Sequence, residues 1–222
     1  MRFAPRRPSP LGGKSPTRAD LPAFIHKPID DIVPASNENE RLRLLIIGVN
    51  PSPWTAAVNA PFAHPGNRFW PSLASGGILP HIVNASAGLK DSDVELLASR
   101  RIGITNIVPD LATTRADELT RDQLRDGAAH VIAKVRHLHP ESVAISGITA
   151  YRMAFQKPKA ALGYQDPRQN MLPANWPIDV PLFVVPQPSG LNAHETIETL
   201  GQKWAAVWEF TEGRKGKSSI PR

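Results

Sequence analysis

The stretch LRLLIIGVNPSP, residues 42–53, decides the fold class of this chain. Its first half is a short apolar run, and its second half is a loop rich in Gly and Pro. A short, continuous apolar run predicts a strand that is buried on both faces, as in a parallel sheet. In open sheets of this kind, ligands bind in the loops at the carboxyl ends of the strands. Asn50 is therefore a polar side chain at the expected mouth of a site.

Strands and helices alternate along the rest of the chain. Two capping boxes predict helix starts, one with Ser92 and Glu95 and one with Thr120 and Gln123. We expect strands over 42–48, 102–108, 142–146 and 182–185, and helices over 67–76, 92–100, 120–138 and 149–156, with a last helix near residue 200. This alternation predicts an α/β fold of three layers (α/β/α) with a central, mostly parallel four-stranded sheet.

The ends of the chain differ from its middle in composition. We expect a basic, Pro-rich and largely disordered segment over residues 1–38, a globular domain over 39–212, and a basic tail over 213–222. Residues 1–19 and 214–222 contain nine Lys or Arg and no acidic residue, although the whole chain of 222 residues has a net charge of only +6. The basic character belongs to the two ends, so it argues only weakly for nucleic acid as a partner.

Composition excludes several classes of protein. The chain contains no Cys, which excludes disulfides, thiolate catalysis and Cys-ligated iron–sulfur clusters. It has no run of about 18 apolar residues, so no membrane span is expected. The first residues lack the apolar core of a secretory signal, and we therefore expect a cytoplasmic protein.

Three further motifs accompany the GVNP loop of residues 48–51. They are PFAHPGNRFW at 61–70, GITNIV at 103–108 and PQPSGLN at 186–192. Together the four segments resemble the motifs of the mismatch-specific uracil-DNA glycosylase and thymine-DNA glycosylase family, over about residues 42–210. GVNP alone would be a weak signal, whereas its combination with the second and fourth motifs is specific.

The resemblance implies an activity and a partner. It implies a monofunctional, monomeric glycosylase that hydrolyses the N-glycosidic bond of uracil in mismatched duplex DNA after flipping the base out of the helix. The expected partner is double-stranded DNA that contains uracil or a mismatched pyrimidine, and neither a metal nor an organic cofactor is expected. The motifs hold no Lys that could form a Schiff base, so strand cleavage is not expected.

The resemblance also assigns roles to residues. Asn50 would position the attacking water, because an amide can orient water but is not basic near neutral pH. Phe62 would stack on the flipped base. The expected base-binding residues are Val49, Thr55, Phe62, Asn67, Asn106 and Gln187. The expected wedge and opposite-base contacts are Ser189, Gly190, Leu191 and Asn192, with Leu191 filling the space that the base leaves.

Each of these assignments has a structural alternative. Asn50 before Pro could simply form a turn, and Phe62 could be a core aromatic. Asn67 could cap the next helix, and Leu191 could be the hydrophobic staple of the last one. Gln187 stands where relatives carry Asn or Ser. Relatives often have Arg just after the wedge loop, where this chain has Ala193 and His194.

Other polar residues suggest different chemistry less strongly. For His64, a hydrogen bond within its own loop is favoured over a role as catalytic acid. Ser52 and Ser189 lack the G-x-S-x-G context of a serine hydrolase. We expect His137 and His139 to lie at a solvated helix end without partnering carboxylates, and we therefore expect no metal site there. Two other functions stay open: a non-catalytic protein that binds damaged DNA, and a hydrolase of small nucleotides.

Overall fold

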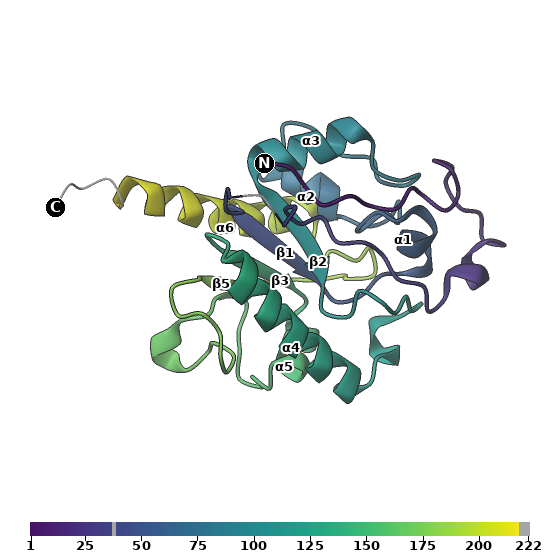
Figure 1. Ribbon diagram of the computed structural model, residues 1–222. Coiled ribbons are helices and arrows are strands. Elements are labelled where there is room, and N and C mark those ends of the chain that lie inside the picture. Colours follow the sequence, from purple (N-terminus) through teal and green to yellow (C-terminus); the bar gives the residue numbers. More distant parts are fainter. Residues whose placement is uncertain (37–38, 218–222) are drawn as a thin grey trace.

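The centre of the molecule is a five-stranded sheet with the order β2-β1-β3-β5-β4 (Figure 1). The structure is a computed structural model that describes residues 1–36 and 39–217. Four strands run parallel: β1 (Leu44–Gly48), β2 (Ile102–Asn106), β3 (Val143–Ser146) and β5 (Leu182–Val185). The expected α/β class with a mostly parallel sheet is confirmed.

The expected count of four strands is wrong by one. The additional strand, β4 (Gly163–Tyr164), has two residues and pairs antiparallel with β5 at the edge of the sheet. Both of its residues are exposed. A strand this short and this exposed has no apolar run, which is why the hydrophobic pattern does not reveal it.

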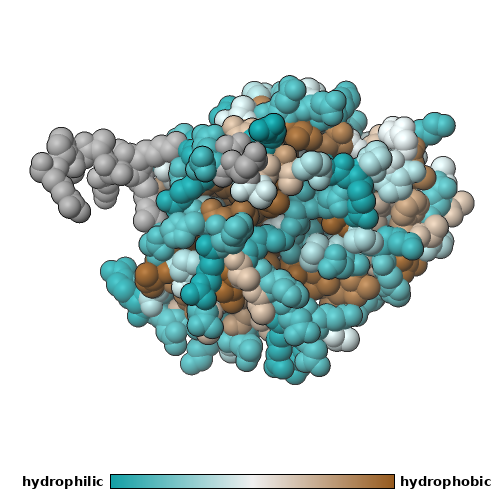
Figure 2. All heavy atoms as spheres, in the orientation of Figure 1, coloured by the Kyte–Doolittle hydropathy of each residue, from teal (hydrophilic) through white to brown (hydrophobic). Residues whose placement is uncertain are grey.

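Helices cover both faces of the sheet, which explains why every residue of the parallel strands is buried. In Figure 1, α4 (Arg121–Leu138) and α5 (Ile148–Ala154) lie on one side of the sheet, whereas α2 (Phe69–Ser75), α3 (Asp91–Arg100) and α6 (Ile197–Lys217) lie on the other. The face of the molecule in Figure 2 is largely hydrophilic, with apolar side chains in separate patches.

The strand order brings distant loops together. β1 lies between β2 and β3. After β1 the chain first forms β2 on one side of it, and then forms β3 and β5 on the other side. Such a reversal of strand order opens a crevice at the carboxyl ends of the strands, where α/β proteins bind ligands. The loops that follow β1, β2, β3 and β5 therefore meet at one edge of the sheet.

A short helix that the sequence pattern does not reveal follows β1. α1 (Pro53–Val58) begins in the GVNPSP loop, and the hydroxyl of Ser52 caps it by accepting a hydrogen bond from Thr55 N at 3.2 Å. Pro53 occupies the first helical turn, where a missing N–H costs nothing. The two prolines that suggest an irregular loop are thus compatible with a helix start.

The N-terminal segment differs from the expectation of a largely disordered tail over 1–38. Residues 1–36 pack against the domain: Phe3 is buried and forms a bridge with Pro34, and Ile32 exchanges two backbone hydrogen bonds of 2.8 Å with Ile104 of β2. The physical reason is that Phe3, Ile29 and Ile32 bury apolar surface one residue at a time, without the periodicity of a helix or strand.

The expected basic tail over 213–222 begins as part of a helix, because α6 continues to Lys217. Residues 218–222, like residues 37–38, lie outside the part of the chain that the structure describes. Among the described residues, no helix has the length and apolar character needed to cross a membrane.

Candidate active site

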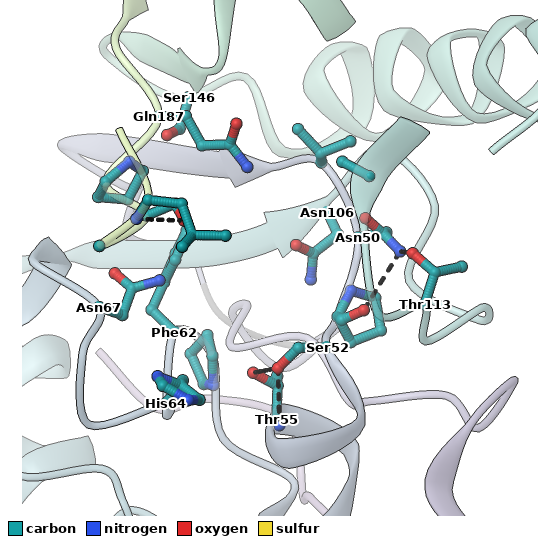
Figure 3. A pocket seen from close by; sticks show the side chains of 18 of the residues that line it. Asn50, Ser52, Thr55, Phe62, His64, Asn67, Asn106, Thr113, Ser146 and Gln187 are labelled. Carbon is teal, nitrogen blue, oxygen red and sulfur yellow. Dashed lines mark hydrogen bonds between the residues drawn. The ribbon is translucent and has the colours of Figure 1, made fainter. Parts of the chain in front are cut away.

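A cavity of about 640 Å³ opens at the carboxyl ends of the parallel strands (Figure 3). All but one of the residues that the sequence assigns to a site line it, namely Val49, Asn50, Thr55, Phe62, Asn67, Asn106, Gln187, Ser189, Gly190 and Leu191. The exception is Asn192, whose Nδ2 donates to Gln187 O at 3.0 Å and so links the two ends of the loop of residues 187–192. Asn50 and Gly190, which lie 140 residues apart in the sequence, therefore line one space.

Three acceptors hold the amide nitrogen of Asn50. Nδ2 donates to Thr113 Oγ1 at 2.7 Å, to Leu111 O at 3.0 Å and to Pro51 O at 3.2 Å. The Thr113 hydroxyl donates in turn to Arg115 O at 2.7 Å, which leaves a lone pair for Asn50. Because the acceptors occupy the nitrogen side, Oδ1 is the atom that Asn50 presents to the cavity. Two of these contacts come from a distant loop, so a local turn does not explain the placement of Asn50.

The cavity offers little acid–base chemistry. Among the described residues that line it, the ionisable side chains are those of His64 and Arg68. His64 Nδ1 accepts a hydrogen bond from Gly66 N at 3.1 Å, and its ring packs edge-on against Trp54, as the structural interpretation of this His predicts. No cluster of three or more His, Asp or Glu that could hold a metal occurs in the described ranges. A water molecule here would be held by amides and hydroxyls.

Phe62 takes part in both packing and lining. Its backbone has a φ of 54°, in the left-handed region, and its ring stacks on Phe69 with 3.9 Å between centroids and 23° between planes. The close approach of the loop requires Gly48, because a Cβ there would lie 3.2 Å from Phe62 Cζ and 2.4 Å from Asn106 Oδ1. The half-buried ring forms a rigid wall of the cavity, suited to stacking on a flat ring.

Three amides face the same space. Asn67 Oδ1 accepts from Phe69 N, the first residue of α2, at 2.9 Å, but the N-cap of α2 is Arg68, so Asn67 lies one position before the cap that its structural alternative predicts. The residue also lines the cavity. Within the described residues, its Nδ2 makes no hydrogen bond, and neither do the side-chain amides of Asn106 and Gln187. Free amides can donate and accept together, which suits the alternating polar edge of a nucleobase.

Leu191 projects at the rim of the cavity and is 92% exposed. This exposure excludes the interpretation of Leu191 as a hydrophobic staple, which would bury the side chain against α6. Its loop is nevertheless rigidly held: Arg68 Nη1 donates to Asn192 O at 2.7 Å and to Glu195 O at 2.6 Å, and Nη2 donates to Gly190 O at 3.2 Å.

Gly190 permits the two loops at the rim to touch. A Cβ at this position would lie only 2.5 Å from Gly66 O, in the loop between Phe62 and α2. A larger residue would therefore force the two loops apart.

Sequence reasoning missed Thr113 and Ser146. Thr113 lies in a loop without a recognisable motif, and only the structure reveals its contact with Asn50. Ser146 ends β3, lines the cavity, and donates to Pro186 O at 3.3 Å. The rule that identified Asn50, a polar residue at the carboxyl end of a parallel strand, could have found Ser146 as well.

Fold and site together define a protein that can hold a flat, amide-like heterocycle in a crevice and place a water beside it. The model of the uracil DNA glycosylase superfamily matches residues 35–211, and the chain belongs to this superfamily. Membership supports a general role as a DNA glycosylase in base excision repair, with DNA as the substrate.

Proposed function

We propose that this protein is a monofunctional glycosylase that removes uracil from mismatched duplex DNA and leaves an abasic site. The proposal is supported by the hydrogen bonds of Asn50, whose Nδ2 donates to three protein acceptors. Its Oδ1 would then be the atom that accepts a hydrogen bond from a water molecule. The family motifs around Asn50 and Leu191 favour the mismatch-specific branch of the superfamily.

The proposed reaction needs no strong base. As the bond between base and sugar breaks, positive charge develops on the sugar, and such a cation captures even a weakly activated water. Asn50 Oδ1 accepts a hydrogen bond from that water and aims it at the sugar carbon. A preorganised contact of this kind lowers the barrier because it needs no rearrangement during the reaction.

The departing base carries negative charge, and the amides of the cavity can stabilise it. Asn67, Asn106 and Gln187 offer donors to its oxygens, while Phe62 provides a surface for stacking. The base must first leave the duplex, at a cost of a few kcal/mol in unstacking. Leu191 would enter the vacated space and offset part of that cost.

We propose that the enzyme acts as a monomer in the cytoplasm and needs neither a metal nor an organic cofactor for the chemical step. Val49 and the wedge-loop residues Ser189, Gly190 and Asn192 would contribute contacts to the flipped base and to the opposite strand, as the family resemblance implies.

A panel of single-lesion DNA substrates tests the proposed function. Uracil opposite G, A, C or T, thymine opposite G, and uracil in single-stranded DNA are each incubated with excess enzyme, and free base is measured. We expect release of uracil from the G mismatch. Tight binding to the mismatch without release would instead identify a non-catalytic binder of damaged DNA, and hydrolysis of free nucleosides alone would identify a small-molecule hydrolase.

Replacing Leu191 by Ala is expected to slow uracil release from duplex DNA on the order of tenfold, since the gap left by the flipped base is no longer filled. Release from single-stranded DNA should change much less, because no stack has to be restored there. Single-turnover rates on the two substrates provide the measurement. An equal loss on both would argue against the wedge role.

Replacing Thr113 by Val is expected to slow base release about two- to tenfold. Val has the shape of Thr but cannot accept the 2.7 Å hydrogen bond from Asn50 Nδ2, and a neutral hydrogen bond contributes about 0.5–1.5 kcal/mol. The bonds of Nδ2 to Leu111 O and Pro51 O remain, so the loss should be partial. Affinity for a uracil-containing duplex should stay the same; an unchanged single-turnover rate would show that Thr113 does not orient Asn50.

A further inference from the structure

One wall of the cavity comes from outside the segment that the superfamily model matches. That segment begins at residue 35, yet Ile29 lines the cavity and is 5% exposed. Ile29 packs with Ala56 of α1 and with Ala112 of the loop after β2. The N-terminal segment of this chain is therefore a part of its catalytic crevice, which its Pro-rich composition does not suggest.

The same segment is hydrogen-bonded to the loop that orients Asn50. We call residues 26–30 the N-terminal strap. His26 N donates to Ala112 O at 2.8 Å, Ala112 N donates to Lys27 O at 3.2 Å, and Ile29 N donates to Pro109 O at 3.1 Å. The loop of residues 109–113 thus lies between the strap and Asn50, to which it presents Leu111 O and Thr113 Oγ1.

Asn59, at the end of α1, anchors the strap from the other side. Its Nδ2 donates to Arg7 O at 2.8 Å and to Asp30 Oδ2 at 2.9 Å, and its Oδ1 accepts from Asp30 N at 2.9 Å. Arg7 completes the anchor with an ion pair of 2.7 Å to Asp30 Oδ1. Burial alone would raise the pKa of Asp30, but hydrogen bonds from Arg7 and Asn59 outweigh it and lower the pKa, so the carboxylate is charged at neutral pH.

We propose that the N-terminal strap is a positioning element for catalysis: anchored by Asn59, it fixes the loop of residues 109–113 so that this loop holds Asn50 in its reactive orientation. The inference rests on the proposed function. It assigns a role in orienting Asn50 to residues 26–30, which lie outside the matched segment 35–211. Backbone bonds to the strap restrict the loop, and a reacting group that shifts by about 1 Å loses much of its effect on the rate.

The test uses the full chain with Asn59 replaced by Gly. Asn59 has a φ of 47°, which Gly adopts without strain, so this change removes the anchor while permitting the helix end. The matched control is Asn175→Gly, because Asn175 is exposed and also has a positive φ, of 62°. We expect Asn59→Gly to slow single-turnover release of uracil about tenfold, with unchanged affinity for the duplex, and the control to leave both unchanged.

A second pair of variants separates positioning from general destabilisation. In an Asn50→Ala background, Asn59→Gly should leave the residual rate unchanged, because the strap acts through Asn50. Should Asn59→Gly fail to fold, Asp30→Ala replaces it, since this variant loses the ion pair with Arg7 but keeps the hydrogen bond from residue 30 N to Asn59. We expect Asp30→Ala to lower the rate of uracil release less than Asn59→Gly would. In the Asn50→Ala background it should not lower the rate at all.

Two results would overturn the inference. One is a folded strap variant with the rate of the Asn175→Gly control; the other is the same fractional loss with and without Asn50, which would indicate a merely structural role. The proposed function fails in a different way, through absence of uracil release by the unmodified protein. If the unmodified protein releases uracil at a rate that depends on Asn50 but not on the strap, the inference about the strap fails while the proposed function stands.

Discussion

Replacing Asn50 by Ala is expected to slow single-turnover release of uracil from a G mismatch by about 10²–10³-fold, the loss that follows removal of one preorganised polar contact to a reacting group. The side chain of Asn50 is held by acceptors from two separate loops, so its Oδ1 needs no rearrangement to receive a water. Alanine leaves the water without an acceptor, and no carboxylate among the described lining residues can replace it.

Binding to DNA should survive this substitution, because affinity depends on phosphate contacts and on the wedge loop rather than on the water. Rates at saturating enzyme are therefore measured together with affinity for a duplex that carries an uncleavable uracil analogue. Near-wild-type release by Asn50→Ala would rule out Asn50 as the residue that positions water. A parallel loss of binding would instead suggest that Asn50 acts on the duplex or the base.

The parallel core of the fold could be predicted because each of its strands is buried on both faces and therefore reads as an apolar run. β5 (Leu182–Val185) agrees with its predicted bounds, and the capping box of Thr120 and Gln123 opens α4 as expected, with bonds in both directions. The box predicted at Ser92 and Glu95 is wrong by two residues: Asp93 accepts from Lys90 N at 2.9 Å, and α3 begins at Asp91.

Elements with a weak or mixed signal could not be found in this way. α1 has six residues and two nearby prolines, β4 has two exposed residues, and the N-terminal segment buries isolated apolar side chains. All three depend on tertiary contacts rather than on a local period. Two of the three nevertheless contribute to the candidate site, because α1 carries Thr55 and the N-terminal segment supplies Ile29.

From the sequence, residues of the candidate site could be predicted where a polar side chain lies at the end of a predicted strand. Asn50, Asn106 and Gln187 all follow or end parallel strands, so their convergence follows from topology. The hydrogen-bond partners that orient these residues could not be predicted from the sequence. The bond from Asn50 to Thr113, for example, joins residues 63 positions apart. Sequence reasoning therefore identifies groups that can meet a ligand, whereas their orientation needs the structure.

Thymine is expected to be a much poorer substrate than uracil, because Thr55 occupies a wall of the cavity where the family resemblance places C5 of the base. Thr55 is 5% exposed, and its Oγ1 accepts from Ser52 Oγ at 3.1 Å, so the β-branched side chain cannot easily rotate away. A thymine methyl would meet this close-packed wall, and one misplaced methyl costs about 1–3 kcal/mol, or roughly ten- to two-hundred-fold in rate.

Two substitutions test which part of Thr55 excludes the methyl. Thr55→Ser keeps the hydroxyl that Ser52 contacts and removes only the γ-methyl, whereas Thr55→Gly clears the whole side chain. If the side chain is the obstacle, the rate for thymine relative to uracil, each opposite G, should rise with Ser and rise further with Gly. Similar rates for the two bases in the unmodified protein, or an unchanged ratio in Thr55→Gly, would show that discrimination lies elsewhere, in the amides that face the base rather than in the wall beside its C5 atom.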